Sequence, residues 1–231
     1  MNRLMLIVAA LACGCTDPST HEYAAVIRGK LATSDLSQAK AMHDRIAQGA
    51  QEAANAHGDF AHDALLGTTM LDSTPNEFLA IDRWSDGDAM EAFYTDPTAF
   101  GSVFAAPPSI EFFVAEPDWT QWGDMNSGDA YQPYYFHFAL GELAQSDIVA
   151  NRTAHNQVAS GGKDPSIGAG NVAHVVFLGK HDAQRFLAVD IWRSADNIQA
   201  FYTNPNFVSA FAPLFSSVSQ PVFQSTDWYQ W

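Results

Sequence analysis

The chain carries the same segment twice, and this internal repeat limits its fold more than any other feature. Residues 78–97 read FLAIDRWSDGDAMEAFYTDP and residues 186–205 read FLAVDIWRSADNIQAFYTNP, with 11 of 20 positions identical at an offset of 108. Each copy ends in a similar tail, DWTQW at 118–122 and DWYQW at 227–231. Self-similarity on this scale indicates one structural unit written twice. A site in one half should therefore have a counterpart in the other.

Length and charge narrow the class of protein. The repeat divides the 231 residues into two modules, each of about 100 residues, which is a common domain size. The apolar fraction of 47% is enough for two cores, and the formal net charge is −15. An acidic surface repels phosphate backbones, so nucleic acid is not expected as a partner.

Residues 1–20 are predicted to be a secretory signal and tether rather than part of a module. A short positive start is followed by the apolar run 4–12, which is too short to span a bilayer as a helix. Both cysteines, Cys13 and Cys15, stand directly after it. This stretch resembles a bacterial lipobox, which implies lipidation of Cys15 or Cys13 and a lipid anchor in the cell envelope; an ordinary cleaved signal is the alternative. The modules themselves contain no cysteine, so no disulfide, thiolate nucleophile or cysteine-based metal site is expected.

Each copy shows the same order of elements. In the first copy, strands are predicted at 22–28, 60–68, 77–84 and 109–115, and helices from residue 35 onward and at 89–94. Asp35 is a candidate N-cap with Gln38 three residues later, and apolar side chains at 36, 39, 46, 50 and 53 mark the predicted buried face of the first helix. The order strand–helix–strand–strand–helix–strand is that of the ferredoxin-like fold.

The strands are apolar on both faces, as in residues 172–178, whereas a half-exposed sheet would alternate apolar and polar. Each sheet therefore needs a second cover besides its helices. We expect an α+β protein in which two tandem ferredoxin-like βαββαβ modules, 21–122 and 134–231, pack sheet to sheet as an intrachain α+β barrel. The polar, glycine-rich segment 123–133 is the expected linker. Such a chain would be a monomer with an intrachain pseudo-dimer.

The pattern FLAxDxW, then AFYxxP, then a short aromatic-rich closing strand resembles the dimeric α+β barrel superfamily. Within it, the chain is most similar to the antibiotic biosynthesis monooxygenase-like group. Those proteins usually pair two single-module chains, and two modules in tandem would form the pair alone. The resemblance covers most of residues 22–231 and implies the fold more specifically than the activity. The architecture hosts oxygenases, haem-degrading enzymes, isomerases and proteins without known chemistry.

Histidines recur at equivalent positions and are the main candidates for chemistry. His43 and His155 lie on the predicted inward face of the first helix of each copy, and His62 and His174 lie near the start of the second strand. Imidazole suits acid–base catalysis near neutral pH as well as metal or haem ligation; a hydrogen-bonded core histidine is the structural alternative. The sequence leaves open which sheet face carries His62 and His174. No metal motif such as HExxH is present, so no metal site is predicted.

Asp82 and Asp190 stand inside a strand, where an acid needs a partner. An indole N–H or a backbone amide is the more common partner, and a histidine that the acid would orient is the alternative. Aromatic residues in each half are expected to be mostly core, with part lining a pocket for a flat apolar ligand. They are Trp84, Phe93, Tyr94, Trp192, Phe201 and Tyr202. The two Trp-rich tails would clamp an edge strand.

Three functions fit these residues. The first, which the resemblance favours, is an extracytoplasmic, cofactor-independent oxygenase for a small aromatic or quinone-like substrate, with the histidines as bases or donors and the aspartates as orienting acids. The second is a lipid-anchored module that binds haem or another flat apolar ligand without turnover. The third is a non-catalytic scaffold in which all four histidines are structural and no pocket of ligand size exists.

Overall fold

The computed structural model describes residues 21–95, 100, 102–128 and 132–231. The predicted targeting segment, with Cys13 and Cys15, lies outside these residues. No helix within the described part of the chain is both long enough and apolar enough to cross a membrane.

The first module has the predicted order of elements. They are β1 (Tyr23–Lys30), α1 (Leu36–Ala56), β2 (Asp59–Leu71), β3 (Glu77–Trp84), α2 (Gly87–Phe93) and β4 (Ser109–Ala115). Strand β1 pairs with β3 and β4, and β2 pairs with β3, all antiparallel. The resulting order β4-β1-β3-β2, with both helices on one face, is the ferredoxin-like arrangement.

The second module repeats this plan with additions. Its elements are β5 (Tyr135–Leu143), α3 (Ile148–Gly168), β6 (Asn171–Gly179), β7 (Arg185–Trp192), α4 (Ala195–Tyr202), α5 (Pro205–Phe211), the 3-10 helix η3 (Ala212–Leu214), β8 (Phe215–Ser219) and β9 (Pro221–Ser225). Helix α5 was not predicted. Pro205 follows the end of α4, as expected, but it also occupies the first turn of α5. A proline is tolerated there because the N–H that it lacks would have no partner within the helix. Between the modules, the 3-10 helix η2 (Met125–Gly128) places Met125 in the barrel core.

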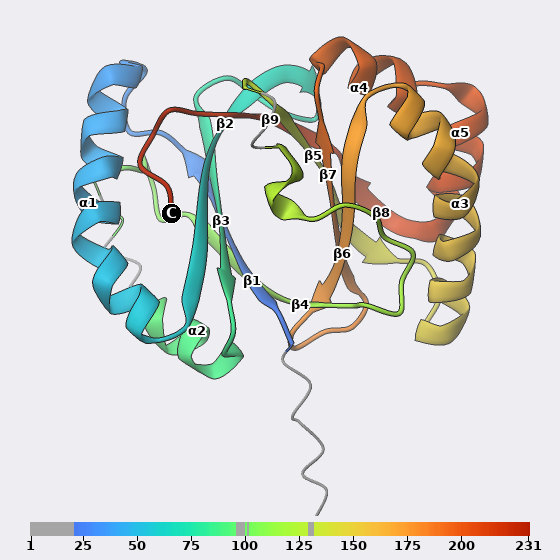
Figure 1. The fold of residues 1–231 in the computed structure, drawn as a ribbon, viewed down its shortest axis with the longest axis horizontal. Coiled ribbons are helices and arrows are strands. Elements are labelled where there is room, and N and C mark those ends of the chain that lie inside the picture. The colour runs from blue at the N-terminus through green and yellow to red at the C-terminus, as the bar shows by residue number, and fades with distance from the viewer. Residues whose placement is uncertain (1–20, 96–99, 101, 129–131) are drawn as a thin grey trace, which may run out of the picture.

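The two sheets join at both edges into one closed barrel (Figure 1). Strand β4 pairs with β6, and β2 pairs with β9. The order β7-β6-β4-β1-β3-β2-β9-β5 then returns to β7 through the β5–β7 pair. Helices α1 and α2 cover one side of the barrel, and α3, α4 and α5 cover the opposite side (Figure 1). The prediction of an intrachain α+β barrel built from two ferredoxin-like modules is confirmed.

The strands are apolar on both faces because each face borders a separate core. Inside the barrel, fully buried phenylalanines such as Phe113, Phe136 and Phe177 meet across the two sheets. Outside, Phe78 and Ala80 of β3 belong to the core beneath α1. Alternate residues of a strand point to opposite faces, so neither face is left to water.

Helix α1 begins as predicted, but its buried face differs in part. The carboxylate of Asp35 accepts from the N–H groups of Ser37 and Gln38 at 3.0 and 3.1 Å, which makes it the N-cap. Leu36 is 46% exposed and Ala53 is exposed, so their predicted inward position is wrong. Leu36 stands at the first helical position, where the sheet no longer covers it, and Ala53 falls beside the buried stripe. That stripe consists of Ala39, His43, Ala47 and Ala54.

Candidate functional site

His43 from α1 and His62 from β2 meet beneath the helix. Their Nε2 atoms are 3.1 Å apart, the ring centres are 5.3 Å apart and the ring planes differ by 12°. The rings therefore lie end to end, with the two nitrogens between them. Both side chains are buried, with 5% and 7% of their surface exposed. His62 thus faces the helices rather than the barrel interior, which the sequence left open.

Asp82 on β3 holds the other end of His62. The two residues lie opposite one another in the β2–β3 pair, and Asp82 Oδ1 accepts a hydrogen bond from His62 Nδ1. The hydroxyl of Tyr94 donates to Asp82 Oδ2. The prediction that an indole or a backbone amide satisfies this acid is wrong. Its partner is the histidine, because directly opposite residues in an antiparallel pair project to the same face.

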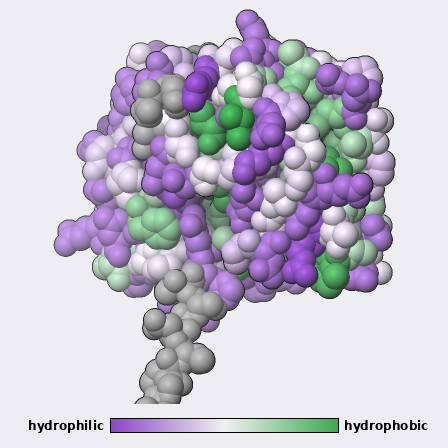
Figure 2. Space-filling model, turned by 45° about the vertical axis from the view of Figure 1, so that its right-hand side comes forward, coloured by the Kyte–Doolittle hydropathy of each residue, from purple (hydrophilic) through white to green (hydrophobic). Residues whose placement is uncertain are grey.

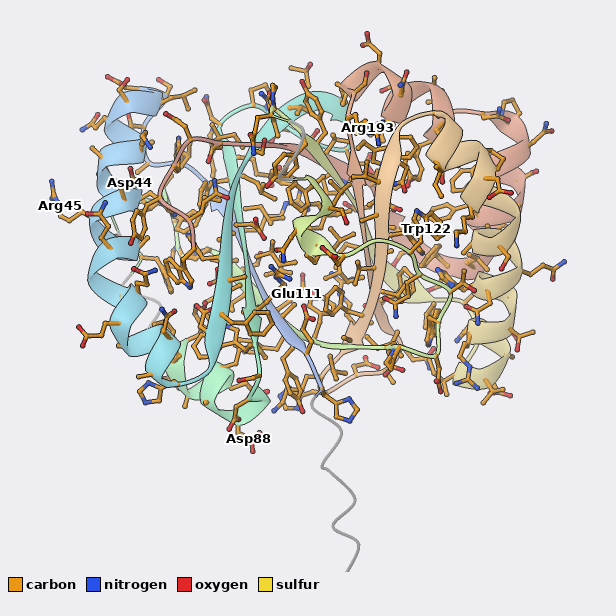
Figure 3. All side chains as sticks on the ribbon, in the orientation of Figure 1. Asp44, Arg45, Asp88, Glu111, Trp122 and Arg193 are labelled. Carbon is orange, nitrogen blue, oxygen red and sulfur yellow. The ribbon has the colours of Figure 1, made fainter. Side chains whose placement is uncertain are left out.

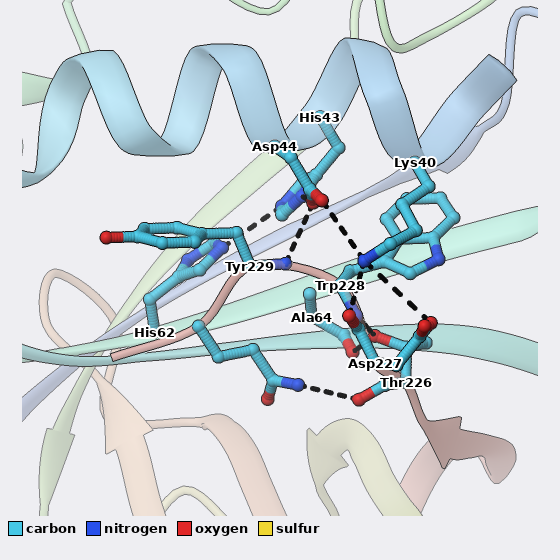
Figure 4. A network of polar contacts seen from close by, with 10 residues as sticks. Lys40, His43, Asp44, His62, Ala64, Thr226, Asp227, Trp228 and Tyr229 are labelled. Carbon is cyan, nitrogen blue, oxygen red and sulfur yellow. Dashed lines mark hydrogen bonds and ion pairs between the residues drawn. The ribbon is translucent and has the colours of Figure 1, made fainter. Parts of the chain in front are cut away.

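The outer end of the chain of contacts is Asp44, also on α1. Its Oδ1 lies 3.1 Å from His43 Nδ1 and accepts from the backbone N–H of Tyr229 at 2.8 Å, as Figure 4 shows. Lys40 lies 3.1 Å from the second oxygen. We call the connected set Asp44, His43, His62, Asp82 and Tyr94 the first relay.

The second module repeats this arrangement, as the sequence repeat predicts. The Nε2 atoms of His155 and His174 are 3.3 Å apart, and His174 Nδ1 lies 2.8 Å from Asp190 Oδ1. Tyr202 donates to Asp190 Oδ2 at 2.8 Å. At the outer end, His155 Nδ1 lies 3.2 Å from Asn156 Oδ1, so an amide stands where the first module has a carboxylate. These five residues form the second relay.

Each relay needs one more hydrogen than two neutral imidazoles carry. In the first relay, the contacts of His43 and His62 with Asp44, with each other and with Asp82 are three hydrogen bonds. Ionised carboxylates donate no hydrogen, and a neutral imidazole carries one N–H. Two neutral rings therefore leave one of the three bonds unmade. The relay is complete when the pair has taken up one proton, which a general acid–base catalyst must be able to hold and release.

The pKa shifts within the first pair agree with one shared proton. Burial and the neighbouring His62 lower the pKa of His43 to about 4. Burial also acts against the charged form of His62, but the charge and hydrogen bond of Asp82 outweigh it, so the pKa of His62 is raised. The proton that the pair holds beyond its two neutral N–H groups is therefore favoured on His62, beside Asp82. In the second pair, burial and His174 lower the pKa of His155 to about 3.

The tail of the second module covers the relay of the first. Trp231 stacks on His62 with ring centres 4.6 Å apart, and Trp228 packs on His43 at 5.2 Å. The backbone N–H of His62 donates to the carbonyl of Trp231 at 2.8 Å. In Figure 4 this segment runs directly beneath α1.

The tail of the first module covers the second relay in the same way. Trp122 stacks on His174 at 4.7 Å, and the backbones of these residues exchange N–H···O bonds of 3.1 and 2.8 Å. The N–H of Thr120 donates to Asn156 Oδ1 at 2.6 Å. Asp44 on α1 and Trp122 beside α3 mark the two sites on opposite sides of the barrel in Figure 3. Besides adding contacts at strand edges, the tails therefore close the histidine sites of the opposite halves.

A cavity lies beside each relay. The centre of a water molecule can occupy about 60 Å³ in the first cavity and about 50 Å³ in the second. Since one water needs roughly 10–15 Å³ by this measure, each cavity holds a few water-sized groups. The first is lined by all of its relay except Asp44, with Phe78, Phe93 and Trp231 among its walls. The scaffold hypothesis predicts no such pocket.

Four of the six predicted aromatic pocket residues line the cavities. They are Phe93, Tyr94, Phe201 and Tyr202. Trp84 and Trp192 are fully buried and are not part of either cavity wall, so their predicted ligand role is wrong. They pack with ring centres 5.3 Å from Phe93 and Phe201, respectively, and belong to the hydrophobic core.

Asp59 is a wall residue that the sequence reasoning missed. It is 4% exposed and lines the first cavity, and burial together with the charge of Asp82 raises the pKa of its carboxyl to about 8. At the equivalent position, 112 residues later, the second module has Asn171. Comparing the two copies position by position is the signal that could have revealed it.

The second module also has a polar residue near its relay that the first module lacks. This residue is His137, and the equivalent position in the first module is Ala25. Its Nδ1 lies 3.4 Å from Asp190 Oδ2, its ring stacks on Tyr202 at 3.6 Å, and the side chain is fully buried. Asp190 therefore has two histidine partners. Together they lower the pKa of its carboxyl against the effect of burial.

Neither a metal ion nor haem fits the relays as they stand. The Nε2 atoms are 3.1 Å apart. A metal ion midway between them would be closer to each nitrogen than the zinc–imidazole distance of roughly 2.0–2.1 Å allows. Haem iron needs a histidine nitrogen of its own, whereas every ring nitrogen of His43 and His62 contacts a protein atom. The first cavity, at about 60 Å³, is also far too small for a porphyrin. Within the described residues, no cluster of three or more His, Cys, Asp or Glu side chains is arranged to hold a metal ion.

No protein-family model matches the chain, and no curated protein is similar to it in sequence. Solved structures share its fold. A protein of Fusobacterium nucleatum subsp. nucleatum, described provisionally as a monooxygenase, has a TM-score of 0.61 at 5% identity, covering 90% of this chain and 93% of that one. An anthrone oxidase-like protein has a TM-score of 0.60 at 14% identity, covering 93% of this chain and 94% of that one. A variant of the chlorite dismutase of Candidatus Nitrospira defluvii has a TM-score of 0.57 at 9% identity, covering 90% of this chain and 92% of that one.

These likenesses and the closed eight-strand order define the class: the chain has the dimeric α+β barrel fold, with both halves in one polypeptide. The superfamily resemblance of the sequence is confirmed at the level of the fold. Identities between 5% and 14% carry no information on the reaction, which has to be argued from the relays.

Proposed function

We propose that the protein is a cofactor-independent oxygenase that acts on a small hydroxyaromatic or quinone-like compound at the relay cavities. One observation carries this proposal: in each half, a histidine pair that can hold one extra proton lines a cavity walled by aromatic side chains. The fold is compatible with this reaction class, because solved structures that share it include proteins described as a monooxygenase and as anthrone oxidase-like.

The relay would supply the proton transfers of such a reaction. In the form that has released its extra proton, the histidine pair removes the proton of a phenolic hydroxyl and regains its third hydrogen bond. The phenolate reduces dioxygen and forms a carbon–oxygen bond to it, and the pair returns the proton to the resulting peroxide. Loss of the ring C–H proton, with cleavage of the O–O bond, then releases water and leaves a quinone. Phenol and dioxygen thus give quinone and water, and the relay ends in its starting protonation state.

A location outside the cytoplasm is part of the same proposal. It is supported by the apolar run and the lipobox-like cysteines of residues 1–20. The anchor would be lipid on Cys15 or Cys13, with the chain acting as a monomer. Mass spectrometry of the mature protein from its native membrane would test this, because a diacylated N-terminal cysteine is expected and an unmodified N-terminus would contradict it.

Oxygen uptake with electron-rich phenols tests the reaction. General acid–base catalysis contributes roughly 10²–10⁴-fold to a rate, so His43→Ala with His155→Ala should lower turnover by at least about 100-fold. His57→Ala is the control, because the ring of this exposed histidine hydrogen-bonds only to the carbonyl of Ala53 within the described part of the chain. Full turnover in the folded double variant would remove the histidines from the reaction.

A binding module without turnover is the second candidate. It is favoured by the observation that every ring nitrogen of the first pair already has a protein partner. The ligand would be a small aromatic molecule, because haem does not fit. Saturable binding of phenols without oxygen uptake would favour this candidate over the oxygenase.

A further inference from the structure

The two cavities differ in two polar wall residues. Ser166 lines the second cavity where the first has Ala54, and its hydroxyl is committed to the carbonyl of Lys163 at 2.8 Å. Asp59, at the start of β2, lines the first cavity. Its counterpart Asn171 is not part of the second cavity wall. Asn171 Oδ1 accepts from Trp122 Nε1 at 2.7 Å, and Asn171 Nδ2 donates to the carbonyl of Ala173 at 3.0 Å. The amide is therefore committed within the protein, whereas a carboxyl faces the ligand space of the first module.

The surroundings of Asp59 keep its carboxyl protonated at neutral pH. His62 on β2, Asp82 on β3 and Tyr94 after α2 are its titratable neighbours. Burial and the charge of Asp82 raise the pKa of Asp59 to about 8, although a hydrogen bond from the N–H of Ala61, the charge of His62 and the side chain of Trp231 act in the opposite direction. A protonated carboxyl donates an O–H hydrogen bond, which an ionised one cannot.

We propose that Asp59 donates a hydrogen bond to the carbonyl oxygen of an aromatic ketone or quinone bound in the first cavity, and that the second cavity lacks this recognition. The proposal rests on the proposed function, since it takes the same cavity as the substrate site. Phe78, Phe93 and Trp231 supply the apolar walls for the ring. The oxygen of the ligand is then the one polar atom that needs a partner inside the cavity, and leaving it unpaired would cost binding.

A variant that fills the second cavity isolates the first. Gly162 lines the second cavity, and a Cβ there would lie 3.8 Å from Phe201 and 4.0 Å from Phe207. The larger side chain of Gly162→Leu would therefore occupy the cavity space. In this background, binding of acetophenone is compared with that of ethylbenzene by calorimetry. The two probes have nearly the same shape, neither ionises, and only acetophenone has an acceptor oxygen.

Acetophenone is expected to bind about tenfold more tightly than ethylbenzene at pH 6.5, the effect of one buried hydrogen bond. This preference should vanish by pH 9.5, when Asp59 is ionised. Asp59→Ala should lose the preference at both pH values. Asp59→Asn should also lose the preference at both, because the amide at the equivalent position, Asn171, is committed to Trp122 and Ala173.

Two results would overturn the inference. If the preference survives in Asp59→Ala, or does not change with pH in the Gly162→Leu parent, Asp59 is not the donor, while the cavity stays a candidate substrate site. If neither probe binds to the parent at either pH, the first cavity is not a site for aromatic ligands. The proposed function then fails together with the inference.

Discussion

At the scale of single residues, the two sites share a relay and differ in the groups around it. Asp44 and Asp59 in the first module correspond to Asn156 and Asn171 in the second. The first site therefore has two more carboxyl groups within the relay and cavity. An ionised carboxyl group favours retention of a proton on a nearby imidazole, and Asp44 stands beside His43 where the second module has the neutral amide of Asn156. The first module is therefore the better proton store of the two.

Asp59 should make the folded protein less stable as the pH rises. Its pKa is raised from 3.8 to about 8, so between these values the native state binds more protons than the unfolded state, and the free energy of unfolding falls with increasing pH. Asp59→Asn removes this loss. The stability of the variant relative to the wild type should rise from pH 4 to pH 8 and then stay level. The total gain should be on the order of 6 kcal/mol, because the pKa differs by about four between the two states and a difference of one is worth about 1.4 kcal/mol.

Urea denaturation at several pH values measures this difference. Asn171→Asp is the matched variant, because it places an acid at the equivalent buried position and should lose stability over the same pH range. A difference between Asp59→Asn and the wild type that does not vary with pH would show that Asp59 is ionised throughout.

At the scale of elements, the tails are exchanged between the halves. The segment after β4 covers the second relay and the segment after β9 covers the first, each with two tryptophans against the histidines. The sequence shows that the tails correspond to one another. It does not show what they cover, because packing between residues distant in the sequence leaves no local pattern. The face of His62 is also not predictable, since both faces of its strand are apolar.

Each tail tryptophan should protect the histidines of the opposite module. Trp231→Ala removes the ring that stacks on His62, so His62 and His43 should become reactive toward diethyl pyrocarbonate, read by peptide mass spectrometry. His155 and His174 should stay protected. Trp122→Ala is the mirror variant and should expose the second pair instead. Equal exposure of both pairs in either variant would contradict the assignment of one tail to one site.

At the scale of the whole molecule, the halves form one barrel and share one interior core. Strand pairs β4–β6 and β2–β9 cross between the modules, and residues of both modules fill the barrel. The surface in Figure 2 shows hydrophobic groups as separate small patches among hydrophilic ones. This agrees with apolar strand faces that are covered within the chain itself.

This interior core should couple the unfolding of the two halves. Leu79 lies inside the barrel and is 1% exposed, so Leu79→Ala should cost about 2–5 kcal/mol. Hydrogen exchange should show the same loss of protection in α1 and α3. Leu36→Ala, at an exposed position, is the control with little expected effect. Loss confined to α1 would mean that the modules unfold independently.

The fold was predictable because it depends on repetition and periodicity, which a single sequence displays. The duplicated FLAxDxW segment and the apolar strand faces predict paired ferredoxin-like modules. The sites were predictable only in part. His43 and His155 were placed under their helices, but Asp59 and His137 were missed, because residues present in one copy alone do not stand out in a search for recurring ones. Helix α5 was missed because Pro205 marks both the end of one helix and the start of the next.

The geometry of the first relay requires that its histidine pair share one proton beyond the two neutral N–H groups. Nitrogen-15 NMR of the histidine rings at pH 6 tests it most directly. We expect three ring hydrogens on His43 and His62 together: one on each Nδ1 and one between the two Nε2 atoms. Asp44→Asn should weaken the pair's hold on this proton, and the three-hydrogen state should then end at a lower pH. Two hydrogens in the wild type, with one ring nitrogen bare at pH 6, would contradict the account.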